Sequence, residues 1–218
     1  MRGLALLVLG GVLIASSGCG TAGITTPAAQ RLQREDLVAV CRALKSTQRS
    51  VSVELAAAKP AWRLIVNGLP ATAASARPSV AAATASSQAV EVPALLSESQ
   101  AVSLTGPAAQ LAGLFRSFVA LTSRGWKLIG AAITQVDHGS PASARFAREN
   151  VPLYIESVYD GHFSLAQTGK KLLDAYRKLG GPAAFGSALT EGEVDALVRA
   201  YSEAADRLHP HVGVRLGS

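Results

Sequence analysis

The sequence lacks the short signatures of the common reactive sites. It has no Cys-x-x-Cys-His segment for covalent haem, no His-Glu-x-x-His pair for zinc, no glycine-rich phosphate loop and no Gly-x-Ser-x-Gly nucleophile elbow. A di-iron bundle would need a Glu-x-x-His pair on each of two helices, and the sequence contains no such pair. We therefore expect a protein that is not an enzyme, with no catalytic residue, no cofactor and no metal site.

Charged and aromatic residues are also scarce, at 17% and 5%, whereas hydrophobic residues make up 49%. This balance is typical of a globular chain rather than of a charged disordered one. Alanine is abundant and β-branched runs are few, so we expect an all-α fold. No aromatic residues interleave with the basic ones, so a nucleic-acid partner is not expected.

The formal net charge of +6 is unevenly distributed. Basic residues concentrate early in the chain and acidic residues near its end, and we expect these stretches to be solvated faces of neighbouring helices. An alternative is that the basic stretch rests on anionic lipid headgroups. The basic residues are Arg31, Arg34, Arg42, Lys45 and Arg49, and the acidic residues are Glu191, Glu193, Asp195, Glu203 and Asp206.

The first 18 residues have the composition of a signal peptide. Arg2 supplies a positive charge, residues 3–15 form an unbroken apolar run, and three small residues follow at 16–18. The run is shorter than the roughly 20 residues that a membrane span requires. We therefore predict that residues 1–18 direct export and are removed.

Ser16, Ser17, Gly18 and Cys19 resemble the lipobox of bacterial lipoprotein precursors. The resemblance implies that diacylglyceryl is attached to the Cys19 sulfur and that the chain is cleaved before this residue. It also implies an exported protein anchored by lipid to the cell membrane or outer membrane, facing the periplasm or the exterior. Gly20 carries no inner-membrane retention signal of the kind that aspartate provides in that family. In the alternative, cleavage follows Ser17, and Cys19 pairs with Cys41 in a disulfide; otherwise Cys41 is a buried free thiol.

The mature chain reads as an antiparallel bundle of about four long helices. We expect a tether at residues 19–26, a helical domain at 27–208 and a loose tail at 209–218. Within the domain, residues 70–93 are rich in alanine, serine, threonine and proline, which favours a low-complexity linker or a weakly packed helix. A short helical segment is expected at 95–104.

Helix boundaries are indicated by proline, glycine and capping residues. Thr26 with Pro27 predicts the first helix start, and Pro60 is expected to kink or end that helix. A second long helix is expected from Thr105 to Gly139. Ser140 with Pro141 starts the next one. Pro152 is expected to separate or kink its first turns, after which the apolar period continues to Leu179, before Gly180, Gly181 and Pro182. Thr190 and Glu193 fit a capping box for the last helix.

His162 is the polar residue that interrupts the apolar stripe of the third long helix. It is either packed inside with a hydrogen-bonding partner or part of a ligand pocket. His209 and His211 flank Pro210, and we interpret this segment as a helix stop rather than a metal site.

Three functions remain in competition. The first is a lipid-anchored envelope protein with a structural or protein-interaction role, whose partner is an unknown envelope protein or polymer. The second is a binding protein for a small apolar ligand held between the helices, suggested by His162 and Gly169 in the third stripe. The third is an enzyme, which the missing signatures make the least favoured.

Overall fold

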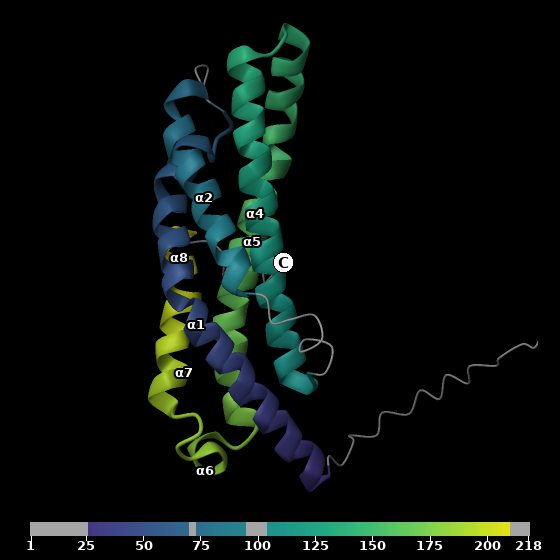
Figure 1. The fold of residues 1–218 in the computed structure, drawn as a ribbon, viewed down its shortest axis with the longest axis vertical. Helices are drawn as coiled ribbons and strands as arrows, with labels where there is room; N and C mark the ends of the chain where they lie inside the picture. The colour runs from purple at the N-terminus through teal and green to yellow at the C-terminus, as the bar shows by residue number, and fades with distance from the viewer. Residues whose placement is uncertain (1–25, 70–72, 95–103, 210–218) are drawn as a thin grey trace, which may run out of the picture.

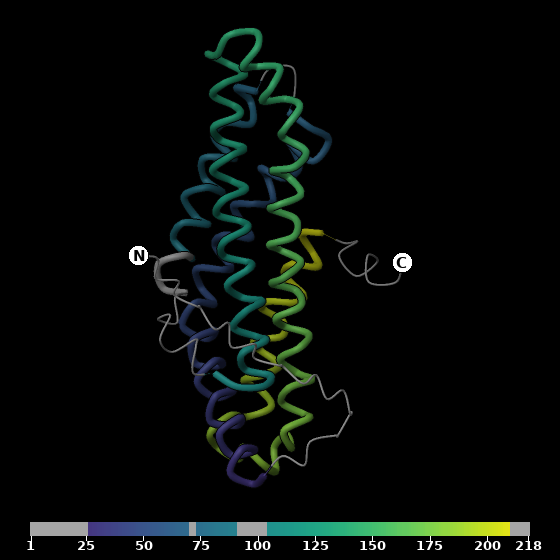
Figure 2. Tube along the Cα trace, turned by 90° about the vertical axis from the view of Figure 1, so that its right-hand side faces the viewer, coloured from purple at the N-terminus to yellow at the C-terminus, as the bar shows by residue number. Residues whose placement is uncertain are grey.

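The computed structural model describes residues 26–69, 73–94 and 104–209, and these residues confirm the all-α prediction. No strand occurs among them, and the elements form an elongated helical stack (Figures 1 and 2). The elements are α1 (Pro27–Ile65), η1 (Ala73–Ser75), α2 (Arg77–Ala94), α4 (Gly106–His138), α5 (Pro141–Lys178), α6 (Gly181–Phe185), α7 (Glu191–Val198), the π-helical turn η2 (Arg199–Glu203) and α8 (Ala204–Leu208).

The predicted signal peptide, Cys19 and all but the last residue of the expected tether at 19–26 lie outside the described residues. So do the segments 95–103 and 210–218, which include most of the expected short helix and tail. Within the described part, no helix combines the length and apolarity that crossing a membrane requires.

The long helices α4 and α5 form an antiparallel hairpin with a two-residue connection (Figure 1). Their backbones approach closely where glycines replace larger residues. At Gly161, a Cβ atom would lie 2.7 Å from Thr122 Cγ2 and 3.0 Å from its backbone nitrogen. The close packing therefore depends on the absence of a side chain at this position.

The alternative that Pro60 ends the first helix was wrong, because α1 continues through it to Ile65. Pro60 lies on the exposed side, whereas Ala58, Ala61 and Ile65 are fully buried. Proline removes one helical hydrogen bond, but burial of the flanking residues holds the helix together. The same holds for Pro152, which is exposed inside the single helix α5, so the separate leading turn was also wrong.

Residues 70–72 lie outside the described part, and for residues 77–93 the linker interpretation was wrong as well. Residues 77–94 form α2, which packs between α1 and α4 and buries Val80, Ala83, Ser87 and Val90. These positions recur at steps of three and four, so small residues suffice to form one buried face. The alternative of a helix in this region is confirmed.

Side-chain caps fix three predicted helix starts. Thr26 Oγ1 accepts from Ala29 N at 3.3 Å, and Ser140 Oγ accepts from Ser143 N at 3.2 Å. The capping box of Thr190 with Glu193 is present in both directions. Thr105 precedes α4 as expected, but its hydroxyl and N–H both donate to Asp36 and do not cap the helix.

The last predicted helix is divided into α7, η2 and α8, so the four long helices expected from the sequence are not all found. The π-helical turn η2 buries Tyr201, whose hydroxyl donates to the carbonyl of Leu44 on α1 and lies 3.1 Å from Thr47 Oγ1. Cys41, one turn before Leu44, is buried and forms no disulfide within the part of the chain that the structure describes. Burial raises its pKa to about 12, with a further contribution from Glu193.

The described core consists of two main hydrophobic clusters stacked along the bundle. One contains Leu55, Phe118 and Leu165, and the other contains Trp126 and Val158. Where the two clusters meet, α1 and α5 carry polar side chains instead of apolar ones. This junction forms the candidate site.

Candidate functional site

A buried carboxylate and imidazole join α1 to α5 at the junction of the two hydrophobic clusters. Glu54 and His162 have no solvent exposure. His162 Nε2 lies 3.0 Å from Glu54 Oε1 and 3.2 Å from Glu54 Oε2. Because a carboxylate only accepts hydrogen bonds, His162 donates through Nε2. The pairing provides partners for two groups that would otherwise be costly to bury.

The chain of contacts continues to the C-terminal segment. His162 Nδ1 lies 2.9 Å from Nε2 of His209, which is 4% exposed. A neutral His162 that donates through Nε2 accepts at Nδ1, so His209 donates to it. Glu54, His162 and His209, which we call the relay, therefore link α1, α5 and the residue that follows α8.

Aromatic residues surround the relay on both sides. Trp126 Nε1 donates to Glu54 Oε1 at 3.4 Å, and Phe118 lies beside His162. The ring of His209 meets Trp62 edge-on at a centroid distance of 4.2 Å and Tyr159 at 5.1 Å. These rings keep water away from the histidines.

Burial, followed by the influence of the neighbouring His162, lowers the pKa of His209 to about 3. His209 is consequently neutral at physiological pH. The relay orients His162 and joins α1, α5 and the residue that follows α8 through hydrogen bonds.

A surface groove opens beside the end of the relay. It has a volume of about 450 Å³ and lies between the end of α1 and the first half of α5. Trp62 and Tyr159, which contact His209, also form part of its wall. The groove is lined by Trp62, Val66, Asn67, Gly68, Pro152, Ile155, Glu156 and Tyr159.

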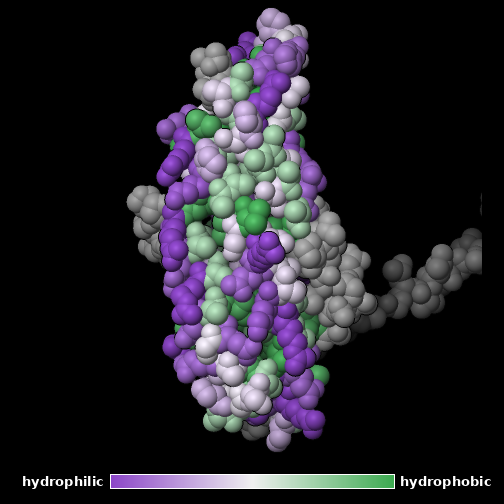
Figure 3. Space-filling view, turned by 60° about the vertical axis from the view of Figure 1, so that its left-hand side comes forward, coloured by the Kyte–Doolittle hydropathy of each residue, from purple (hydrophilic) through white to green (hydrophobic). Residues whose placement is uncertain are grey.

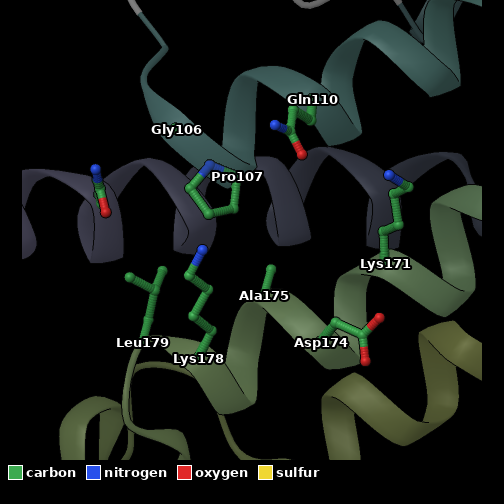
Figure 4. A pocket seen from close by; sticks show the side chains of 9 residues that line it. Gly106, Pro107, Gln110, Lys171, Asp174, Ala175, Lys178 and Leu179 are labelled. Atoms are coloured by element: carbon green, nitrogen blue, oxygen red, sulfur yellow. The ribbon is translucent and has the colours of Figure 1, made fainter. Parts of the chain in front are cut away.

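Another hollow, of about 390 Å³, lies between the start of α4 and the end of α5 (Figure 4). Lys171, Asp174 and Lys178 line it, and all three are exposed. Two lysines and one aspartate give it charges of both signs, so we assign no ligand to it.

No match was found. Comparison with protein-family models yields none, and neither do the comparisons with curated proteins and with solved structures.

The structure places the residues that the sequence analysis named in different surroundings. His162 is packed inside with hydrogen-bonding partners, and it does not line the groove. His209 is buried against it, so the expectation that the loose tail begins at residue 209 was wrong; His211 and Cys19 lie outside the described residues. Among the described residues, no three His, Cys, Asp or Glu side chains are grouped to hold a metal ion.

Glu54 was missed, although the sequence contains a signal for it. On α1 the buried positions 47, 51, 54, 58, 61 and 65 are spaced alternately by four and three, and Glu54 occupies one of them. A carboxylate on such a stripe requires a buried partner. His162, the polar residue on the stripe of α5, is that partner.

Proposed function

We propose that the protein is an exported envelope lipoprotein, anchored through Cys19, whose helical bundle has a structural or protein-interaction role. The observation that carries this proposal is the lipobox-like segment at 16–19, followed within eight residues by the start of α1 at Pro27. The intervening residues 20–26 span at most about 25 Å when extended. The anchor would therefore hold the beginning of α1 close to the lipid surface.

The shape of the bundle supports a role in contacting partners away from the membrane. The 39 residues of α1 correspond to a length of about 58 Å. The connection between α4 and α5 lies at the opposite end of the molecule from the start of α1 (Figure 1). A partner that binds near this connection would be held tens of ångströms from the anchor.

Large apolar side chains are exposed towards this far end. Leu153 is 61% exposed and Phe146 58% exposed, both on the first part of α5, and Val66 follows α1. Figure 3 shows, on one face of the molecule, hydrophobic residues reaching the surface between hydrophilic ones. Phe146 and Leu153 are two turns apart and therefore lie on one side of α5, and adjoining exposed apolar residues are typical of surfaces that other proteins cover.

The interior offers less support for a ligand held between the helices. Gly169 leaves no gap, because a Cβ atom there would lie 2.7 Å from the backbone nitrogen of Ser202. His162 is likewise surrounded by its partners. Both positions that suggested an internal ligand are thus filled by the protein itself.

The anchor is tested by mass spectrometry of the protein purified from membranes after expression of the full chain. We expect an N-terminal Cys19 carrying a diacylglyceryl group, and a Cys19→Ala variant that is released from membranes. An unmodified cysteine, or a retained signal segment with the protein in the cytosol, would refute the proposal.

The interaction role is tested by placing a photo-crosslinking amino acid at position 153 or, as a control, at the exposed position 32 near the start of α1. We expect a discrete crosslinked product from position 153 in intact cells. Equal crosslinking from both positions, or none from position 153, would count against a partner at the far end.

A further inference from the structure

The groove between α1 and α5 has the chemistry of a binding site for an organic cation. Its volume of about 450 Å³ falls in the range of roughly 300–1,000 Å³ that small-molecule sites occupy. Its wall combines two aromatic rings, Trp62 and Tyr159, with the apolar side chains of Val66, Pro152 and Ile155. An apolar body of moderate size would be desolvated on this wall.

The charged side chain that lines the groove is negative. Glu156 is the charged residue among those that line it, and no described residue forms an ion pair with it. Asn67 adds a neutral amide at the same end of α1. A ligand with a positive charge would therefore meet an available carboxylate, whereas an anion would be repelled.

The aromatic rings strengthen this preference. Trp62 and Tyr159 are stacked, with centroids 6.2 Å apart and an interplanar angle of 29°. The faces of tryptophan and tyrosine attract cations through the ring quadrupole, and tryptophan does so best. His209, which packs against both rings, is neutral because burial lowers its pKa to about 3, so it adds no opposing positive charge.

We propose that this groove binds a small amphipathic cation, an organic ammonium with an apolar body, through Trp62, Tyr159 and Glu156. The ammonium group lies between the Glu156 carboxylate and the aromatic faces, and the apolar body rests on Ile155, Pro152 and Val66. This site is separate from His162 and Gly169 in the interior, and it does not depend on the lipid anchor.

Calorimetric titration with three probes that share one apolar body tests the proposal. The probes are 3-phenylpropylammonium, the neutral 3-phenylpropan-1-ol and the anion 3-phenylpropionate, added to the purified protein in the same non-ionic detergent. We expect the cation to bind at least fivefold more tightly than the alcohol, and the anion to bind most weakly. Fluorescence locates the site, because Trp126 is fully buried and only Trp62, of the two tryptophans in the chain, lines the groove.

Matched variants measure the contribution of the Glu156 charge to binding separately from that of the apolar wall. Glu156→Gln should remove the preference for the cation over the alcohol, while Glu149→Gln, an exposed site two turns away on α5, should keep it. Trp62→Leu should weaken all three probes. Equal binding of cation and alcohol, equal behaviour of the two glutamine variants, or no binding of any probe would overturn the inference. None of these results bears on the acylation of Cys19, so the two proposals fail independently.

Discussion

Replacing Glu54 by alanine is expected to lower the free energy of unfolding by about 2–6 kcal/mol, because two buried hydrogen-bond donors lose their acceptor. The substitution removes the acceptor for His162 Nε2, 3.0 Å away, and for Trp126 Nε1, 3.4 Å away. Both donors then remain in a space without solvent exposure. Each unpaired buried donor costs about 1–3 kcal/mol, so two of them account for the expected loss.

The measurement is urea unfolding followed by far-UV circular dichroism, on Glu54→Ala, His162→Ala and the double variant. The double variant should lose less stability than the sum of the single ones, because each single change strands the other group. Glu149→Ala, at an exposed position, should stay within about 0.5 kcal/mol of the parent. A loss below about 0.5 kcal/mol for Glu54→Ala, or strict additivity in the double variant, would refute the relay as described.

Three further outcomes are expected. The pKa of His209 is about 3 in the folded protein, whereas the unfolded chain keeps the ordinary value of 6.5 and therefore binds the proton first as the pH falls. The free energy of unfolding should consequently fall as the pH drops from about 6.5 towards 3, by up to about 1.4 kcal/mol per pH unit. Urea titrations at each pH should show that His209→Gln flattens this dependence. Gly169→Ala should destabilise strongly, because its Cβ would strike the backbone of Ser202, whereas Gly192→Ala, with open space around it, should be neutral or stabilising by up to about 1 kcal/mol in thermal melts. Cys41 should resist a thiol-specific maleimide in the folded protein and react once urea exposes it; rapid reaction without urea would contradict its burial.

The helix boundaries were largely predictable because they depend on local chemistry. The caps at Thr26, Ser140 and Thr190 involve atoms only three residues away, so the sequence alone specifies them. Proline was a poorer guide. At Pro60 and Pro152 the loss of one helical N–H destabilises the helix less than the burial of the flanking turns stabilises it. That burial depends on neighbours that are distant in the sequence.

The candidate site was only half predictable. A hydrogen-bonding partner for His162 was expected, and Glu54 could have been found from its position on the buried stripe of α1. The contact with His209 could not, because it depends on how the last helical segment packs and on the π-helical turn within it. The groove also depends on tertiary packing, since its two walls are about ninety residues apart in the chain.

The π-helical turn makes the length of the last helical segment as important as its composition. A π turn accommodates one residue more than an α turn, so a deletion within η2 can restore a regular helix and leave the following residues in place. The loss of one residue from α7 would instead rotate everything beyond it by about 100°. His209 would then face away from His162, and α5 would lose its hydrogen bond to the residue that follows α8 without any change in either imidazole.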